Sequence, residues 1–259
     1  MAIIGRDRSG TLEDLVLTAD EGPAGETVAL APLSHGQRSL WFLHHLAPVG
    51  GAYNIAAAMR LLTPVDAGAL ERAFQALVDR HAALRTTFPA VGGEPCRQVA
   101  AELEFKLACE DAAGWSGERL RARLAEEAWR PFDLEQGPLL HVTLFTGHSS
   151  GPVLLLVVHH IVSDFWSLAI VMRETPALYR EAAGAGPARL PPPGLPYEEH
   201  VRLEREALAG ERGAALLAYW KEALAGLPAL ELPTDRPRPA VQTYRGDCHR
   251  LRLSGELAA

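Results

Sequence analysis

The most regular hydrophobic pattern in this chain is an uninterrupted apolar run from Val153 to Val158, followed directly by His159 and His160. Residues 149–152, Ser-Ser-Gly-Pro, precede the run and favour a turn. A continuous apolar run of this length is typical of a β-strand that is buried on both faces. Removing imidazole groups from water costs free energy. A histidine pair at the end of a buried strand therefore indicates a role other than that of ordinary surface residues.

Apolar positions at three- and four-residue spacing predict the helices around this strand. Ser or Asp side chains mark the expected starts of the first helices, because they can accept a hydrogen bond from a free backbone N–H of the first turn. The expected helices are 35–46 after Ser34, one from Asp66 through Leu84, one from Ser116 to Arg130, 165–183, and 197–225 with a break near Gly210. Between the last two, residues 185–196 include three consecutive prolines and are typical of an exposed linker.

Runs rich in β-branched and apolar residues predict the strands. They are expected at 53–62, 105–109, 139–146 and 153–159, and Gly92-Gly93 predicts a hairpin between 86–91 and 94–99. Helices alternate with strands, yet hairpins also occur. The pattern therefore indicates an α+β fold with a mixed β-sheet flanked by helices.

The two ends of the chain lack a sustained hydrophobic period. Residues 1–28 mix Gly, Asp, Glu and Thr, which is typical of a linker or docking tail. Together with the proline-rich linker, this pattern divides the chain into four parts. We expect a tail over 1–28, a first lobe over 29–183, a linker over 184–196, and the beginning of a second, truncated lobe over 197–259.

Composition narrows the function classes. The chain has 259 residues, of which 48% are hydrophobic and 22% charged, as in an ordinary globular protein. Its net charge of −7, without a local cluster of Lys or Arg, argues against nucleic-acid binding. Its three cysteines are scattered, which fits a reducing compartment, and no apolar run is long enough to span a membrane. No signal segment follows Met1, so we expect a cytoplasmic protein without membrane contact.

The histidine pair allows three interpretations. His159 and His160 should point to opposite sides, because side chains alternate along a strand. An imidazole offered to a cleft is a candidate general base, and Asp164, four residues later, could orient it or pair with an arginine. A structural pair in the core is the second interpretation, and a metal site, which opposite-facing neighbours disfavour, is the third. A triad with Ser163 or Ser167 has little support, since no G-x-S-x-G turn is present.

A second histidine pair, His44-His45, serves as a comparison. It lies inside a predicted amphipathic helix and no carboxylate follows it at short range. We interpret it as structural or surface-exposed. His81 and His141 receive the same interpretation as helix-end and strand residues.

Residues 159–167, HHIVSDFWS, resemble the H-H-x-x-x-D-G-x-S signature of condensation domains in nonribosomal peptide synthetases. Further motifs of this family follow its order along the chain. Residues 33–41, LSHGQRSLW, resemble the S-x-A-Q-x-R-x-W motif, and residues 80–88, RHAALRTTF, match R-H-x-x-L-R-T-x-F. The segments FDL at 132–134 and LELPTDRPRP at 230–239 also match, so the resemblance covers about residues 29–256.

The resemblance implies the chloramphenicol-acetyltransferase-like fold, in which two lobes form a V around a tunnel. It implies amide formation between a donor acyl thioester and the amine of an acceptor. Both would be carried on phosphopantetheine arms of peptidyl carrier proteins, so no cofactor or metal is bound directly. The implied partners are the donor and acceptor carrier proteins and adjacent synthetase domains. An alternative on the same fold is a noncatalytic module that recruits a carrier protein or another enzyme.

The resemblance also assigns roles to single residues. His160 matches the family's active-site histidine and His159 supports it. Asp164 matches the structural aspartate, for which Arg85 is the implied partner. We expect this pair to be buried, so that removing either member would leave an uncompensated charge at a cost of about 3–5 kcal/mol. Ser167 completes the matched motif.

The sequence departs from the family in two respects. Phe165 stands where glycine is usual, which predicts a narrowed or reshaped site and an atypical donor, such as the chain of a hybrid polyketide/peptide synthetase. The chain also ends at Ala259, before most of a second lobe. We therefore expect that it does not catalyse condensation alone, and that an exposed apolar face permits self-association.

Overall fold

The computed structural model of the chain describes residues 30–46, 50–237, 239–240 and 244. The tail expected over 1–28 lies outside these residues, as does nearly all of the chain after 240. Within the described part, no helix is long and apolar enough to cross a membrane.

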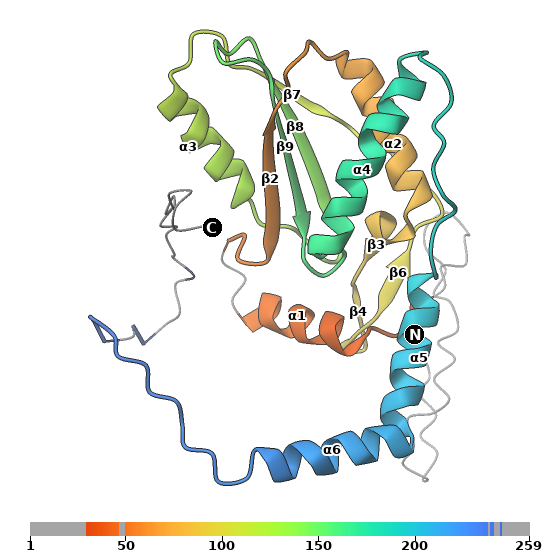
Figure 1. The fold of residues 1–259 in the computed structure, drawn as a ribbon, viewed down its shortest axis with the longest axis vertical. Coiled ribbons are helices and arrows are strands. Elements are labelled where there is room, and N and C mark those ends of the chain that lie inside the picture. Colours follow the sequence, from red (N-terminus) through yellow and green to blue (C-terminus); the bar gives the residue numbers. More distant parts are fainter. Residues whose placement is uncertain (1–29, 47–49, 238, 241–243, 245–259) are drawn as a thin grey trace, which may run out of the picture.

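A four-stranded sheet with the order β2-β9-β8-β7 forms the centre of the fold (Figure 1). Its strands are β2 (Asn54–Arg60), β9 (Val153–His159), β8 (Leu140–Thr146) and β7 (Ala108–Asp111). Strand β9 is antiparallel to both of its neighbours, whereas β7 and β8 are parallel. The predicted mixed sheet is thereby confirmed. The strands expected at 139–146 and 153–159 are present as β8 and β9 and pair with each other.

The helices cover both faces of this sheet (Figure 1). Helices α2 (Ala67–Arg80) and α4 (Phe165–Ala182) lie on one face and α3 (Gly117–Ala128) on the other, while α1 (His35–Leu46) lies near the end at which β9 finishes. All seven residues of β9 are buried. Leu154, Leu156 and Val158 join the core beneath α2 and α4. Val153, Leu155 and Val157 join the core on the α3 side, which confirms a strand buried on both faces.

The predicted helix starts are confirmed by their caps. The Oγ atoms of Ser34 and Ser116 and the Oδ1 atom of Asp66 each accept a backbone N–H of the following first turn, at 3.1, 3.1 and 2.9 Å. Such a side-chain bond typically contributes about 1 kcal/mol. The second helix is shorter than expected, because it ends at Arg80 and a 3-10 turn, η1 (Ala82–Arg85), carries the chain through Leu84.

Short strands form two small sheets beside the central one. Strands β1 (Leu30–Ala31), β6 (Arg97–Val99) and β3 (Thr86–Thr87) make one, and β4 (Ala90–Val91) and β5 (Glu94–Pro95) make the other. The predicted hairpin is confirmed: Gly92 and Gly93 connect β4 and β5 with φ angles of 62° and 86°. Glycine adopts these left-handed conformations without steric cost.

The strand expected at 105–109 is displaced to β7, Ala108–Asp111. Helix α2 supplies the reason. The backbone N–H of Phe105 donates to Gln75 Oε1 at 2.7 Å, and that of Leu107 donates to Glu71 Oε2 at 3.0 Å. These side-chain acceptors replace a strand partner, so regular pairing begins only after Leu107.

The expected break near Gly210 is confirmed, since α5 (Tyr197–Ala209) ends there and α6 (Glu211–Ala223) follows. Val201 of α5 is buried, and the hydroxyl of Tyr197 at the start of this helix lies 2.9 Å from Ser34 Oγ. The linker before it is less exposed than expected, because Ala188 and Leu190 pack against the core. In α6 no residue is buried. The boundary expected between two lobes stays a prediction.

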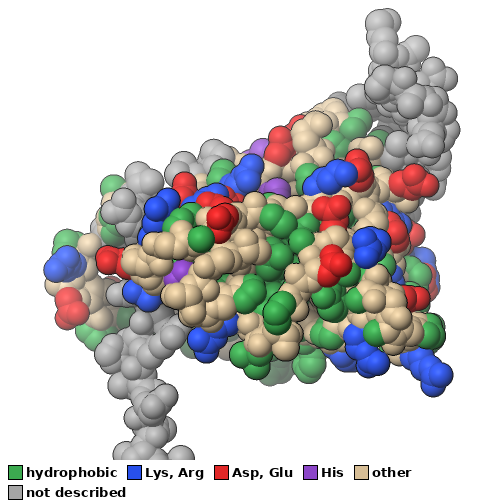
Figure 2. All heavy atoms as spheres, turned by 90° about the horizontal axis from the view of Figure 1, so that it is seen from above, with side chains coloured by type: hydrophobic (Ala, Val, Ile, Leu, Met, Phe, Trp, Pro, Cys, Tyr) green, Lys and Arg blue, Asp and Glu red, His purple; other side chains and the backbone are tan. Residues whose placement is uncertain are grey.

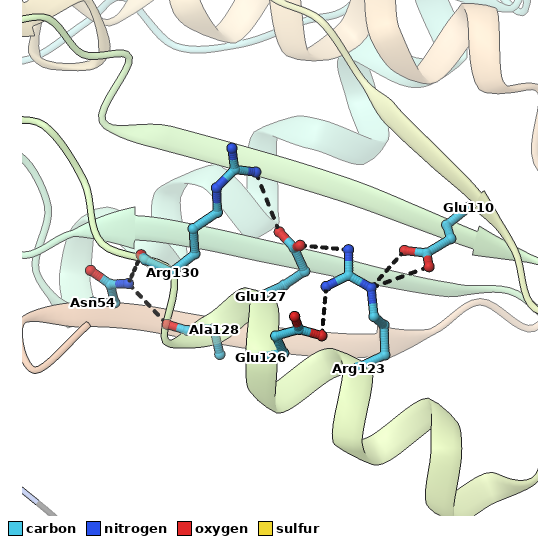
Figure 3. A network of polar contacts seen from close by, with 7 residues as sticks. All are labelled: Asn54, Glu110, Arg123, Glu126, Glu127, Ala128 and Arg130. Carbon is cyan, nitrogen blue, oxygen red and sulfur yellow. Dashed lines mark hydrogen bonds and ion pairs between the residues drawn. The ribbon is translucent and has the colours of Figure 1, made fainter. Parts of the chain in front are cut away.

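A polar network attaches α3 to the sheet (Figure 3). Arg123 of α3 donates to Glu110 of β7 at 3.1 and 3.2 Å and also pairs with Glu127 at 2.6 Å. At the end of α3, the Asn54 amide donates to the carbonyls of Ala128 and Arg130 at 2.9 and 2.8 Å. Asn54 lies opposite the last residue of β9, so this network ends beside the histidine pair.

The end of the molecule that is uppermost in Figure 1 has a mixed surface. Figure 2 shows acidic, basic and hydrophobic side chains interspersed over it, without a large area of one charge. Lys and Arg are therefore not concentrated on this face.

Candidate functional site

The backbone at the end of β9 is fixed from both sides. The N–H of His159 donates to Leu139 O at 3.0 Å, and the N–H of His160 donates to Tyr53 O at 2.8 Å. The two neighbours belong to the segments that flank β9 in the sheet. The histidine pair therefore begins from a rigid position.

His159 is a core residue, with 2% of its surface exposed. Its Nδ1 accepts the N–H of Ile161 at 3.1 Å, so in the neutral ring the proton resides on Nε2. Burial, together with the nearby His44 and His160 rings, lowers the pKa of His159 to about 3. The ring is neutral at neutral pH and holds the backbone of the following turn.

His160 lies on the other side of the strand end, as predicted. Its side chain reaches a cavity, and its Nδ1 lies 2.8 Å from Ser163 O. A carbonyl oxygen can only accept, so Nδ1 carries the proton in this arrangement. The Nε2 atom of the neutral ring then keeps its lone pair and can take a proton from a reactant.

Asp164 caps helix α4. Its Oδ1 accepts the backbone N–H and the Oγ–H of Ser167, each at 2.7 Å. These bonds from Ser167 lower the pKa of the Asp164 carboxyl, and its own backbone and His160 contribute in the same direction. The expectation of a buried Asp164 is wrong, because the residue is exposed and its charge is stabilised locally.

The implied pair between Arg85 and Asp164 is not formed. Arg85 donates instead to the carbonyls of Val78 and Asp79, both at 2.6 Å, and to Ala100 O at 3.0 Å. Helix C-termini leave carbonyls without partners inside the helix, and a guanidinium is well suited to bind them. Arg85 thus caps α2 and ties it to the chain after β6, far from the role that the resemblance implied.

The α1 motif contributes contacts that sequence reasoning missed. The Gln37 side chain is buried, and its Nε2 donates to Ile161 O at 3.2 Å. Trp41 Nε1 donates to Phe88 O at 3.1 Å. Helix α1 therefore holds the turn after His159 and the segment after η1. The polar Gln within an apolar helix motif was the signal that could have indicated this contact.

His44 also lies closer to the site than expected. Its ring centroid is 5.6 Å from that of His159, at an interplanar angle of 80°. Burial and the adjacent His45 lower the pKa of His44, while Asp133 opposes the shift. The structural interpretation of His44 is retained, but its contact with the histidine pair was not predicted.

A cavity of about 380 Å³ opens in front of His160. It is formed by α1, η1, β6, the turn after β9 and the start of α5, and Ser163, Asp164 and Ser167 line it together with His160. Phe165 is 80% exposed and does not belong to the lining. Its expected effect on the site and on donor choice stays a prediction.

The serine triad finds no support in the geometry. The Ser163 contact with His160 is made by its carbonyl, and its Oγ donates toward Asp164 O at 3.4 Å. The hydroxyl of Ser167 donates to Asp164. No serine hydroxyl of the described residues donates to His160. In the same part of the chain, no group of three His, Cys, Asp or Glu side chains is arranged to hold a metal ion.

Comparison with known proteins places this geometry in a family. A family model described as a condensation domain matches residues 29–259. One of the linear gramicidin synthase proteins of Brevibacillus parabrevis is 44% identical over 233 residues, which are 88% of this chain and 4% of the relative. Phosphinothricin tripeptide synthetase PhsC of Streptomyces viridochromogenes is 40% identical over 243 residues, 92% of this chain and 22% of the relative.

Solved structures agree with these matches. The X-domain from teicoplanin biosynthesis is 30% identical, with a TM-score of 0.72 over 81% of this chain and 47% of that one. The first condensation domain of the calcium-dependent antibiotic synthetase, in complex with a substrate analogue, has a TM-score of 0.69 at 23% identity, covering 77% of this chain and 48% of its own. The expected fold class is confirmed. The chain spans about half the length of these structures and far less of the curated relatives.

Proposed function

The chain belongs to the condensation-domain family, and from this premise we propose that it forms an amide bond within a nonribosomal peptide synthetase. The donor is an acyl thioester on one carrier protein, and the acceptor is the amine of a group on another. The observation that carries the proposal is the Nδ1 contact with Ser163 O made by His160, a residue that lines the cavity, because this contact leaves Nε2 of the neutral ring free to accept a proton. A proton acceptor at that position is what an attacking amine requires.

The proposed reaction neither consumes nor releases a net proton. The amine nitrogen attacks the thioester carbonyl carbon, and its proton passes to Nε2 of His160. The C–S bond breaks, and the departing sulfur of the donor arm receives that proton. Holding both tethered reactants in place supplies a large share of the acceleration, since orientation alone can contribute about 7–11 kcal/mol.

The proposed partners follow from this reaction. The substrates arrive on the phosphopantetheine arms of donor and acceptor peptidyl carrier proteins, next to other synthetase domains. We propose that residues 29–183 form the histidine-bearing lobe and that residues 197–259 begin a second one. Exposed Phe165 and Trp166 at the start of α4 offer apolar surface for that lobe or for self-association.

A recruiting module is the second candidate. The observation that favours it is the likeness to the X-domain of teicoplanin biosynthesis, which has been solved in complex with OxyB. The matched chain of that complex is 28% identical to this chain, with a TM-score of 0.72. We place it second because His160, Ser163 and Asp164 keep a connected, cavity-facing geometry. A purely recruiting surface would not require that arrangement.

The test is amide formation from an acyl-loaded donor carrier and an aminoacyl-loaded acceptor carrier, measured by mass spectrometry. The chain is assayed alone and within a synthetase that supplies the rest of a condensation domain. We expect product only in the second case, and a loss of about 100-fold or more for His160→Ala. His148→Ala, in the turn at the other end of β9, is the matched control. Undiminished activity of His160→Ala would refute the proposal.

A further inference from the structure

Arg97 is a buried cation with little to bind. Its side chain, on β6, is only 4% exposed. Its Nε has no hydrogen-bond partner within the described chain. The nearest carboxylate oxygen, Glu198 Oε1, lies 3.6 Å from Nη2, beyond hydrogen-bond range. Buried guanidinium groups normally satisfy their donors, so unused ones require an explanation.

The location of Arg97 connects it with the candidate site. Arg97 and His160 line the same cavity of about 380 Å³. Strand β6 lies between β1 and β3, so the arginine projects from a paired backbone. The proposed reaction uses His160 and leaves Arg97 without a role.

The chemistry of the group selects its ligand. A guanidinium presents a planar set of donors that matches the two oxygens of a carboxylate. A carboxylate already stands near this position, because Glu198 from the first turn of α5 lies opposite Arg97. Glu198 is 64% exposed in its side chain and makes no closer contact with the arginine. It can therefore turn toward solvent when another carboxylate enters.

The size of the cavity restricts where that carboxylate can come from. If the thioester lies at His160, the phosphate of its phosphopantetheine arm lies at the far end of the arm, outside a cavity of this size. The carboxylate must then belong to the reacting group itself. We propose that Arg97 binds the side-chain carboxylate of an acidic aminoacyl substrate, and that Glu198 holds its place before the substrate enters. This inference rests on the proposed condensation function and specifies its substrate class.

The other charges around the cavity do not remove this preference. Asp164 is occupied by two hydrogen bonds from Ser167 and sits at the start of α4. The ring of Tyr197 lies 5.6 Å from the Arg97 guanidinium, but an aromatic ring does not neutralise the positive charge of the arginine. Glu198 is thus the group with which an entering carboxylate competes. The competition predicts opposite effects for the two partners.

The experiment measures binding of stable substrate analogues to the 259-residue chain by titration calorimetry. The probes are aspartyl- and glutamyl-pantetheinamide and their uncharged isosteres, asparaginyl- and glutaminyl-pantetheinamide. We expect one acidic probe to bind about tenfold more tightly than its isostere, as one charge-assisted contact allows. Arg97→Gln should abolish this preference, whereas Glu198→Gln should increase it. Arg38→Gln, which removes an exposed arginine paired with Glu94, is the matched control.

The outcomes separate a binding role from a structural one. If Arg97 only attached α5 to β6, then Arg97→Gln and Glu198→Gln would both lower the melting temperature and neither would change the probe ratio, which would overturn the inference. Glu198→Gln leaves Arg97 intact, so the test remains decisive even if Arg97→Gln does not fold. Binding of no probe would overturn the inference and leave the proposed function standing, because that function is tested separately within a complete condensation domain. Retained acidic preference alongside full activity of His160→Ala would refute the proposed function alone.

Discussion

Replacing His159 by asparagine should make the fold less sensitive to acid. The Asn side chain can still accept the N–H of Ile161 that His159 Nδ1 accepts at 3.1 Å, but it cannot be protonated. The folded-state pKa of His159 is lowered to about 3, below the ordinary value of 6.5. The folded chain therefore binds fewer protons than the unfolded chain between these pH values, and stability falls as the pH falls through this window.

The magnitude follows from the size of the shift. The drop from 6.5 to about 3 corresponds to about 5 kcal/mol in total, at about 1.4 kcal/mol per pKa unit. This contribution of the neutral His159 ring to the free energy of unfolding is fully present above pH 6.5 and is lost as the pH falls to about 3. Between pH 7.5 and pH 5, the wild type should lose about 2 kcal/mol through this residue alone.

Urea unfolding at pH 7.5, 6 and 5, followed by tryptophan fluorescence, measures this loss. The quantity to compare is the change in unfolding free energy with pH for the wild type, His159→Asn and the control His200→Asn, an exposed residue of α5. We expect a shallower pH dependence for His159→Asn alone. Parallel curves for all three proteins would show that His159 is not held neutral by burial.

Two further predictions concern the turn after β9. Because Asp164 caps α4 through Ser167 and not through an arginine, Asp164→Ala should cost about 0.5–2 kcal/mol of stability, and its effect should add to that of Arg85→Ala without coupling. A coupling energy above about 1 kcal/mol in a double-mutant cycle would contradict this prediction, because it would show that Asp164 and Arg85 interact as the resemblance implied. Gln37→Leu removes the donor to Ile161 O and leaves a buried carbonyl unpaired. It should cost about 1–3 kcal/mol in urea unfolding, and an unchanged midpoint would show that the bond contributes nothing.

Much of the fold could be predicted from the sequence because its elements follow local rules. The apolar run of β9, the capping residues Ser34, Asp66 and Ser116, and the glycine pair at 92–93 each determine their own structure within a few residues. The errors arose where a distant segment intervened. The strand expected from residue 105 starts later because side chains of α2 take the backbone donors of that segment.

The residues of the site likewise fall into those that local rules predict and those whose contacts depend on distant segments. The opposite directions of His159 and His160 follow from strand geometry, and the sequence was sufficient for them. The partner of Arg85 was not predictable from spacing, because three backbone carbonyls compete for the guanidinium with any distant carboxylate. Arg97 and Gln37 were missed for a related reason. Each becomes informative only when burial and the cavity are known.

The cavity is lined both by His160 and by the first turn of α5, and these two parts of the chain are held to the fold by different kinds of contact. His160 follows a strand whose backbone is bonded on both sides. Another wall is the first turn of α5, a helix that is held by contacts including Tyr197 with Ser34, Glu204 with the His35 N–H and the buried side chain of Val201. We expect that breaking these contacts would shift this wall while the backbone bonds of the β9 end keep the reacting imidazole in place. Admission of a substrate and alignment of the proton acceptor can thus be altered separately, by mutation or by a docking partner.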